Sequence, residues 1–383
     1  MRVLAKDVSK QVGSEVTVQG WVHRIRELGG ISFVLLRDRS GMVQIVYEGG
    51  VEFTQESVIS VTGTAAENEK APTGYEVQQS STELLAKAAP ELPVSVNQDP
   101  EKLGIDAVLD NRIVSLRIPK IRHIFELQSS VAELFGEYLR SQDFTEIKSS
   151  KLIGSGTEGG TGLFSVDYFG EKVFLAQSPQ FYKQAMVASG MERVFEIGAA
   201  YRAEKHDTPR HLNEYVSLDV EMGFIESEAD LMDLEVGILS HIFAGVQSKH
   251  ADILEEYGSS VPTAEALKKT PRISHDEAKE ILGKRLGKRI FEINPEGERE
   301  LCDWASEEHG VDALFVYGFP RKKRPFYTYP DGLKTKSFDL LFRGLEITTG
   351  GKRINEYDML IETLPKFGLT EEGLGDYCKI FKY

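Results

Sequence analysis

The first eighty residues carry five short runs with the alternating apolar and polar pattern of β-strands. Glycine, asparagine and proline, which form tight turns, separate these runs. The runs are residues 16–22, 31–36, 42–47, 57–63 and 75–80. Five short strands joined by tight turns predict a small closed barrel, and a five-stranded barrel that binds oligonucleotides has the OB architecture. Because the chain has 383 residues, a second core must follow this barrel.

The overall charge at first argues against a nucleic-acid partner. The chain has 45 Lys and Arg against 60 Asp and Glu, a net charge of −15, and evenly spread negative charge repels a polyanion. The barrel region nevertheless groups basic, aromatic and amide side chains: Arg24, Arg26, Phe33, Arg37, Arg39 and Gln44. Such a face suits unstacked bases. The alternative is that these arginines are solvated strand ends.

A polar, proline-containing stretch at residues 89–104 separates the barrel from a region of different character. We therefore expect one domain at residues 1–101 and a second at 102–383. Residues 119–144 place apolar side chains three and four apart, which predicts an amphipathic helix. The runs that follow read as hairpins and helices without regular βαβ alternation. This pattern favours an α+β fold with an antiparallel sheet flanked by helices.

The two cysteines, Cys302 and Cys378, lie far apart in the sequence. This spacing disfavours a disulfide framework and a cysteine metal site. No run of about 18 apolar residues occurs, so we expect no membrane association. A cytoplasmic location fits both observations.

One candidate site lies in residues 195–221, which read as two strands joined by a polar loop. Strand alternation puts Arg202 and Glu204 on one face. An arginine held on a rigid strand offers a planar fork to a phosphate or carboxylate. The alternative is an exposed hairpin whose charges pair across the strands.

A second candidate is a hairpin with a two-residue turn at residues 343–344. In this register Leu341 pairs with Glu346 and Asp339 pairs with Thr348, which makes Asp339 and Glu346 diagonal neighbours. Two converging carboxylates, with room left for phosphates, describe a Mg²⁺ site. The alternative is a carboxylate pair at a solvated sheet edge.

Two weaker signals accompany these hairpins. Residues 157–162 form a glycine-rich loop that carries Glu158, and residues 177–184 follow it with Lys183 on an early helical turn. Gly350 and Gly351 leave room for a ligand near the backbone. Each signal alone is also typical of a plain connection or a solvated side chain.

In this order, the segments resemble the class II aminoacyl-tRNA synthetases of the aspartyl type, in their archaeal and eukaryotic branch. The resemblance covers nearly the whole chain, and its most specific part is the Arg202-Ala203-Glu204 loop together with the Asp339 and Glu346 hairpin. It implies activation of L-aspartate with ATP as a substrate, Mg²⁺ as a cofactor, and transfer of the aspartyl group to tRNA by a homodimer.

The resemblance also implies roles for individual residues. Arg202, Glu204 and Arg210 are expected to be catalytic, and Lys183 and Arg353 are expected to bind the aspartate side chain. The implied ATP site comprises Arg202, Ala203, Glu204, Arg210, His211, Leu212 and Glu346. The implied aspartate site comprises Glu158, Ser178, Gln180, Lys183, Arg202, Asp219, Thr349 and Arg353. Asp339 and Glu346 are the implied Mg²⁺ ligands.

In the barrel, Arg26, Phe33 and Gln44 match family positions that contact anticodon bases. His23 and Pro72 match the residues found in enzymes that charge both tRNA(Asp) and tRNA(Asn). The resemblance therefore implies a non-discriminating aspartate–tRNA ligase, whose Asp-tRNA(Asn) is amidated later.

The chain departs from the family pattern at two places. Residues 149–150 are serines where the first family motif has a proline near the dimer interface. The third motif, a glycine-rich strand and a helix with an ATP-binding arginine, is not found before Tyr383, so we expect a C-terminally incomplete chain with impaired adenylation. The rival interpretations are a catalytically silent paralogue that binds tRNA, and an asparaginyl-type or aspartate-amidating relative.

Overall fold

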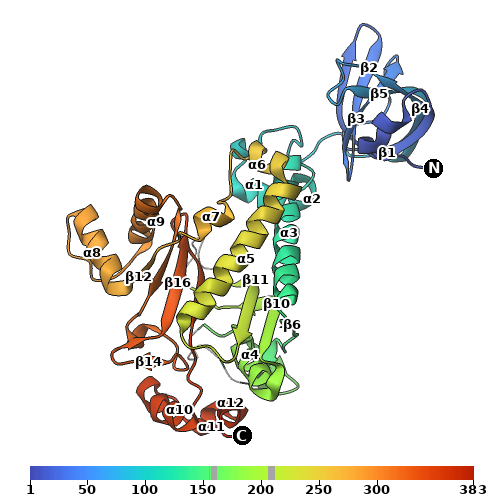
Figure 1. Cartoon of the computed structure of the whole chain (residues 1–383). Coiled ribbons are helices and arrows are strands. Elements are labelled where there is room, and N and C mark those ends of the chain that lie inside the picture. The colour runs from blue at the N-terminus through green and yellow to red at the C-terminus, as the bar shows by residue number, and fades with distance from the viewer. Residues whose placement is uncertain (155, 157–161, 206–211) are drawn as a thin grey trace. The chain divides into compact units, whose positions relative to one another are not determined.

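The computed structural model describes residues 1–154, 156, 162–205 and 212–383. The chain forms two compact units, Met1–Phe125 and Glu126–Tyr383 (Figure 1). Both cysteines are free and buried. Among the helices in the described ranges, none is long and apolar enough to cross a membrane.

The first unit contains a closed five-stranded barrel with the strand order β1-β2-β3-β5-β4. Its strands are β1 (Glu15–Leu28), β2 (Ile31–Asp38), β3 (Gly41–Glu48), β4 (Val58–Glu67) and β5 (Tyr75–Ala86), preceded by a short helix η1 (Ala5–Gln11). Glycine allows the strands to cross closely: a Cβ on Gly20 would lie 2.2 Å from the carbonyl oxygen of Arg37. The predicted barrel is therefore confirmed, with each predicted strand present.

The segment after β5 packs as a small cluster of its own within the first unit. Its helices are η2 (Pro100–Lys102), α1 (Ile105–Asp110) and α2 (Arg112–Ser115). Val96, Ile118 and Ile121 form the buried centre of this cluster. Arg37 of the barrel donates to the carbonyl oxygen of Arg117 at 2.9 Å, which fastens the segment to the barrel.

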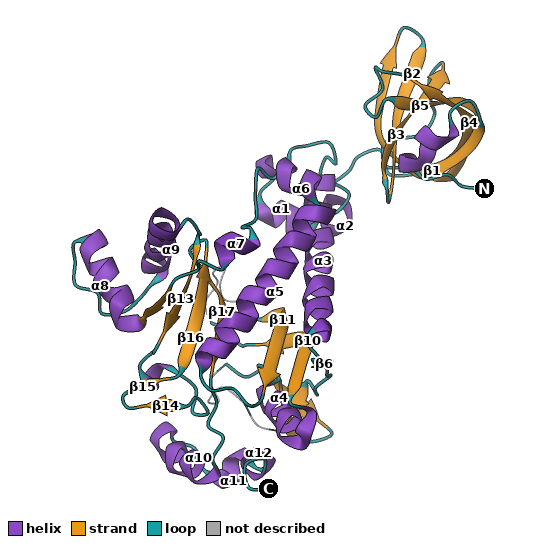
Figure 2. Cartoon of the chain, in the orientation of Figure 1, coloured by secondary structure: helices purple, strands orange, loops and turns teal. Residues whose placement is uncertain are grey.

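The second unit is built on two main sheets, with the strand orders β11-β10-β6 and β12-β13-β16-β17 (Figure 2). Their strands are β6 (Thr145–Glu146), β10 (Arg193–Tyr201), β11 (Glu214–Met222), β12 (Arg272–Ser274), β13 (Ala313–Tyr317), β16 (Ser337–Phe342) and β17 (Leu345–Gly351). The α+β class is confirmed. The main strands pair antiparallel, as expected, and only the edge strands β6 and β12 of these two sheets pair in parallel with their neighbours.

Two long helices, α3 (Pro119–Ser141) and α5 (Glu228–Lys249), lie side by side against one face of these sheets (Figure 1). Leu134 and Leu139 of α3 pack with Ile238 and Ile242 of α5. Gly245 permits this approach, since a Cβ there would lie 2.5 Å from the Leu134 side chain. The predicted amphipathic helix is thus confirmed, and its apolar stripe meets α5 and β10.

Shorter helices and strands complete the second unit. The helices are α4 (Gln180–Met186), η3 (Val187–Met191), α6 (Ala251–Glu256), α7 (Ala264–Leu267), α8 (His275–Leu286), α9 (Pro295–His309), η4 (Arg321–Lys323), α10 (Tyr357–Thr363), η5 (Leu364–Phe367), α11 (Glu371–Leu374) and α12 (Asp376–Lys379). The short strands are β7 (Leu152–Ile153), β8 (Ser165–Tyr168), β9 (Glu171–Leu175), β14 (Pro330–Asp331) and β15 (Lys334–Thr335).

Strand alternation sorts side chains between the two faces of each sheet. Val220 of β11 and Leu340 of β16 point to the buried side with α3 and α5. Asp219 and Asp339, one residue earlier in each strand, therefore point to the other side. The fold thus presents carboxylates from both sheets on the face that the two long helices leave uncovered.

Candidate functional site

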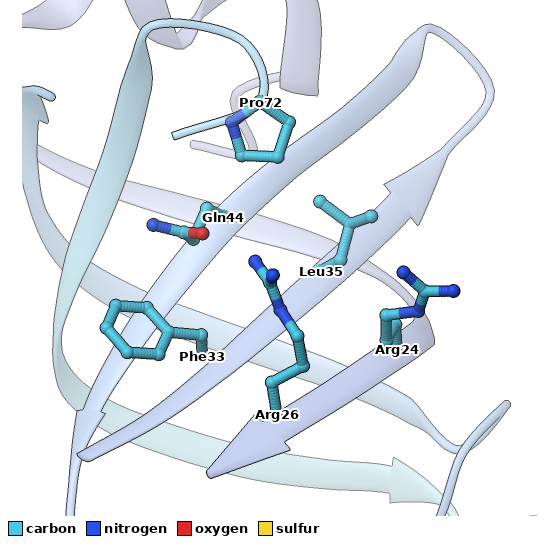
Figure 3. Close-up of a pocket in the computed structure, with 6 residues that line it drawn as sticks. All are labelled: Arg24, Arg26, Phe33, Leu35, Gln44 and Pro72. Carbon is cyan, nitrogen blue, oxygen red and sulfur yellow. The ribbon is translucent and has the colours of Figure 1, made fainter. Parts of the chain in front are cut away.

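A shallow pocket of about 140 Å³ lies on the surface of the barrel (Figure 3). It is lined by Arg24, Arg26, Phe33, Leu35, Gln44 and Pro72. Cross-strand pairing assembles it, because Arg26 of β1 lies opposite Phe33 of β2, and Leu35 lies opposite Gln44 of β3. A ring face, an amide and two guanidinium groups in one hollow can stack on and hydrogen-bond an unstacked base.

The loop that carries Pro72 is tied to the pocket floor. Gln44 donates from Nε2 to Glu76 Oε2 at 3.0 Å, and Asn68 donates to the same oxygen at 2.6 Å. In the described part of the chain Arg24 and Arg26 form no ion pair. The pocket therefore has a fixed amide and two available cations.

His23 lies beneath this surface and not in the pocket. Its side chain is 9% exposed, and its Nδ1 lies 2.9 Å from Nη1 of Arg37, whose Nη2 donates to Glu56 Oε2 at 2.8 Å. Burial, together with the Arg37 charge, lowers the pKa of His23 to about 4. The imidazole is therefore neutral at pH 7 and accepts a hydrogen bond from Arg37 through Nδ1.

In the second unit, the residues after β10 lie at the start of the polar loop predicted from the sequence. The Arg202 N–H donates to the carbonyl oxygen of Asn213 at 2.9 Å, and the Glu204 N–H donates to Asn213 Oδ1 at 3.1 Å. Ala203 donates to the carbonyl oxygen of Gly162 at 2.7 Å. Asn213 thus fixes the backbone around Arg202 from both ends.

The Arg202 guanidinium lies 5.7 Å from the centroid of the Tyr215 ring. Its buried Nε has no hydrogen-bond acceptor among the described residues. Leu212 is exposed at the far side of the loop. The predicted site residues Glu158, Arg210 and His211 lie outside the described residues.

A buried polar cluster, here called the cation cluster, joins α4, β11 and the segment that follows β17. Its members are Gln180, Lys183, Asp219, Glu221 and Arg353. Lys183 Nζ lies 2.9 Å from Asp219 Oδ1 and 3.5 Å from Glu221 Oε2. Arg353 Nε lies 3.6 Å from Glu221 Oε1, and its Nη2 donates to Gln180 Oε1 at 3.1 Å. Two cations and two carboxylates thus balance one another within the cluster.

The electrostatics of this cluster favour charged side chains. Burial acts to raise the pKa of Asp219, but the Lys183 charge and hydrogen bond, together with a hydrogen bond from Ser217, lower it below its ordinary value. Ser178 Oγ accepts from the Gln180 N–H at 3.4 Å at the start of α4. The sequence prediction thus named four of the five members of the cation cluster, and Ser178 lies beside them.

The structure confirms the second predicted hairpin but differs from the prediction in one part of the strand register. Arg343 and Gly344, with φ values of 49° and 78°, form the predicted two-residue turn, and Leu341 pairs with Glu346 as expected. Asp339 pairs with Thr349 and not with Thr348, because a bulge shifts the register between Leu340 and Leu341. The extra residue brings Thr349 onto the same face as Asp339 and Glu346.

The two glycines at the end of β17 have a structural reason that the sequence did not reveal. A Cβ on Gly350 would lie 2.7 Å from the Phe338 ring, and one on Gly351 would lie 2.7 Å from the carbonyl oxygen of Lys336. Close packing against β16 therefore requires glycine at both positions.

The hairpin of β16 and β17 is here called the carboxylate hairpin, after Asp339 and Glu346. Asp339 lies at its centre. Its side chain is 10% exposed, and Oδ2 accepts from Arg324 Nη2 at 2.7 Å. Among the described residues, the buried Oδ1 has no hydrogen-bond partner. An unpartnered buried carboxylate oxygen beside Glu346 and the Thr349 hydroxyl fits a hard divalent cation.

The protein alone supplies few ligands for such a cation. Within the described ranges, no group of three or more His, Cys, Asp or Glu side chains could hold a metal ion. A cation at the carboxylate hairpin would therefore need further oxygen ligands from phosphates or water. This is the usual coordination of Mg²⁺ in nucleotide sites.

Comparison with known proteins now decides the family. Residues 104–383 match the family model of class II tRNA synthetases (D, K and N), and residues 16–85 match that of an OB-fold nucleic acid binding domain. The chain belongs to the class II tRNA synthetases. Within this family it belongs to the aspartyl type, since it is 46% identical to the aspartate–tRNA(Asp/Asn) ligase of Thermus thermophilus over 100% of the chain and 90% of that protein.

Solved synthetase structures share the fold. The asparaginyl-tRNA synthetase of Pyrococcus horikoshii, bound to asparaginyl-adenylate, superposes with a TM-score of 0.90 at 27% identity, covering 100% of this chain and 90% of that one. A putative aspartyl-tRNA synthetase from Leishmania major also gives 0.90, at 26% identity and with 100% and 86% coverage. The synthetase fold is thus common to both amino-acid specificities, and it is the side chains that must distinguish them. Members of this family use ATP.

Sequence reasoning missed two residues of the synthetase site, Glu221 and Arg324. Glu221 accepts a hydrogen bond from Gln180 and forms ion pairs with Lys183 and Arg353. Because it lies two residues after Asp219 on β11, strand alternation places both carboxylates on one face, and this signal could have revealed it. Arg324 had no comparable signal, since it follows the short helix η4 in an irregular segment.

Proposed function

We propose that this synthetase is an aspartate–tRNA ligase that activates L-aspartate with ATP and charges both tRNA(Asp) and tRNA(Asn). The observation that carries the aspartate assignment is the cation cluster, because Lys183 and Arg353 converge from distant segments on one buried site. A substrate with a second carboxylate needs such cations, and a neutral amide does not. The Thermus relative, which is named for both tRNAs, supports the range of tRNA substrates.

Binding of aspartate would rearrange charges that are already paired. We assign Lys183 and Arg353 to the side-chain carboxylate, and Glu158, Ser178, Gln180 and Asp219 to the surroundings of the α-ammonium group. Thr349 completes this set. Glu221 is the counter-ion that Arg353 and Lys183 share before the substrate arrives. Exchange of one carboxylate for another keeps the buried charges balanced.

ATP would lie along the exposed face between the two hairpins. We assign Arg202, with Glu204 and Arg210, to catalysis and Ala203, His211, Leu212 and Glu346 to ATP positioning. The attacking α-carboxylate of aspartate is ionised at pH 7, so the residues need only align it and neutralise charge at phosphorus. The Nε of Arg202, which has no acceptor among the described residues, is a donor suited to this task.

Mg²⁺ is the proposed cofactor of the carboxylate hairpin. Asp339 and Glu346 would hold it, with the Thr349 hydroxyl on the same face. When bound, the cation supplies positive charge to the phosphate oxygens. The buried Oδ1 of Asp339 supports this assignment, because an ionised oxygen without a donor gains most from a cation.

The barrel pocket supports the recognition of tRNA. We assign Arg26, Phe33 and Gln44 to anticodon bases, by stacking on the Phe33 ring and hydrogen bonds from the other two. Pro72 borders this pocket and would act there directly. His23 would act indirectly, since it supports β2 from below through Arg37.

We further propose a homodimer in the cytoplasm, where tRNA is charged for protein synthesis. Val216 and Leu218 of β11 are 68% and 38% exposed, although both are apolar. Exposed apolar side chains on a sheet near its edge suit a partner surface. Analytical ultracentrifugation of the chain tests the dimer, and a monomer at micromolar concentration would refute it.

The aspartate assignment is tested by calorimetric titration with non-hydrolysable aspartyl- and asparaginyl-adenylate analogues. We expect the aspartyl analogue to bind at least tenfold more tightly, and equal affinities would overturn the assignment. Aspartylation of purified tRNA(Asn) tests the dual tRNA range separately. Charging of tRNA(Asp) alone would restrict the enzyme to one tRNA.

A further inference from the structure

Arg324 reaches the carboxylate hairpin from the segment after η4. Its Nη2 donates to Asp339 Oδ2 at 2.7 Å, and its Nη1 donates to Thr349 Oγ1 at 2.8 Å. The guanidinium also lies over the Phe319 ring, 3.8 Å from the ring centroid. Its side chain is 12% exposed. The arginine fork is therefore fixed on two oxygen-bearing side chains of the hairpin and on one aromatic face.

The charge of Arg324 must affect any divalent cation at this place. Asp339, Glu346 and Arg324 carry −1, −1 and +1, which leaves a net charge of −1. A free divalent cation is attracted by this single charge and repelled by the guanidinium on Asp339. A nucleoside triphosphate brings several negative charges of its own, which attract both the metal and the arginine.

We propose that Arg324 is an exchangeable counter-cation: it holds Asp339 and Thr349 until a nucleoside triphosphate arrives with its metal, and it then turns to the phosphates. The inference rests on the proposed Mg²⁺ site at the same hairpin. It makes metal binding depend on nucleotide, because the site attracts the free cation only weakly. By linkage, the metal then favours the nucleotide by the same factor.

The site offers a matched pair of variants for a test. Arg324→Met removes the charge from the hairpin and keeps an unbranched side chain for the Phe319 ring. Arg321→Met removes the same charge three residues earlier, where Nη2 of Arg321 donates to Thr363 Oγ1 at 2.9 Å. Arg324→Gln is a second neutral variant, and Arg324→Lys keeps the charge without the fork.

The measurement is Mn²⁺ binding by electron paramagnetic resonance, with and without a non-hydrolysable ATP analogue. We expect Arg324→Met or Arg324→Gln to bind free Mn²⁺ roughly tenfold more tightly than the unmodified chain, which is the effect of removing one charge near a dication in a hydrated site. The factor by which the ATP analogue strengthens Mn²⁺ binding should fall by a similar ratio. Arg321→Met and Arg324→Lys should stay close to the unmodified chain.

Two results would overturn the proposal, and they have different meanings. Unchanged or weaker binding of free Mn²⁺ in both neutral variants would make Arg324 a structural support of Asp339 only, while the metal site itself stands. If Asp339→Asn leaves Mn²⁺ binding unchanged in the presence of the ATP analogue, the metal is elsewhere. That second result would refute the proposed Mg²⁺ site together with the role of Arg324.

Discussion

The barrel pocket and the cation cluster use positive charge in opposite ways. In the barrel, Arg24 and Arg26 are without ion pairs in the described part of the chain. In the second unit, Lys183 and Arg353 already face Asp219 and Glu221 in a buried site. Exposed unpaired arginines suit a long polyanion that is held through many weak contacts. Buried paired cations suit one small ligand whose charge must replace an existing partner.

This difference explains how a chain with a net charge of −15 can handle RNA. The acidic residues make the net charge of the chain negative, but none of those in the described ranges lines the barrel pocket. The local positive charge of the pocket therefore decides binding there. In the cation cluster, by contrast, the acidic residues are part of the site. The two regions should therefore respond differently to mutation, pH and salt.

The largest effect is expected in the cation cluster. Arg353→Ala should weaken binding of an aspartyl-adenylate analogue by at least a hundredfold. Without this arginine the carboxylate of the ligand's side chain is left unpaired in a buried site, which costs about 3 kcal/mol of binding free energy. Calorimetric titration measures this. Lys352→Ala is the matched control, since the adjacent Lys352 donates instead to the carbonyl oxygen of Glu226. Equal losses in both variants would refute a specific role for Arg353.

The second unit should also lose stability at high pH through Glu235 of α5. Burial and the nearby Asp339 charge raise the pKa of Glu235 to about 7. A hydrogen bond with Thr348 acts in the opposite direction but is too weak to cancel them. Because the folded pKa is above the ordinary value, the stabilisation is complete below about pH 4.5 and is lost as the pH rises through 7.

Glu235→Gln removes this dependence. At pH 8.5 and with a chelator present, the variant should be more stable than the unmodified chain by about 3 kcal/mol, while the two should be similar at pH 5. Hydrogen exchange of α5 peptides measures the difference. Asp233→Asn, an exposed change on the same helix, should alter neither value. A pH-independent difference would contradict an ionising Glu235.

The barrel should show the opposite pH dependence through His23. Its pKa is lowered to about 4 by burial and by Arg37, so its contribution is complete above pH 6.5 and is lost as the pH falls toward 4. Hydrogen exchange of β1 peptides should reveal a loss of roughly 2–3 kcal/mol over this range. His23→Asn keeps a neutral acceptor and should flatten the profile. A profile that stays as steep would assign the acid sensitivity to another group.

Local pattern was sufficient for the barrel and for the two hairpins. The alternation and the turn residues within and beside each strand are enough to define that strand. The turn at Arg343 and Gly344 needs a positive φ at both positions. The bulge after Glu346 was not predictable in this way. Nothing local requires an extra residue there, and the pairing is decided by how β17 fits the whole length of β16.

The contacts within the sites depend on much longer distances along the chain. Arg353 and Gln180 are 173 residues apart, and Tyr377 donates to Gln184 across 193 residues. Sequence spacing cannot say that such segments meet, so Lys183 and Arg353 could be grouped only by family resemblance. The partners of these cations, Glu221 above all, required the packed structure.

The smallest effects separate two kinds of contact within the barrel pocket. Phe33→Ala should weaken binding of an anticodon stem-loop about tenfold, because stacking on one base contributes about 1–3 kcal/mol. Phe33→Leu keeps apolar area without the aromatic face and should also bind weakly. Affinity equal to that of the unmodified chain would remove Phe33 from the interface.

Arg24 and Arg26 can be told apart by salt. Both arginines are exposed. We expect Arg24 to contact a phosphate, so Arg24→Gln should reduce the slope of log affinity against log salt by about 0.7 to 1. Arg26 lies opposite Phe33, and a base contact from it would lower affinity with little change of slope. Equal slope changes in both variants would assign both arginines to the phosphate backbone, and the pocket would then read bases through Phe33 and Gln44 alone.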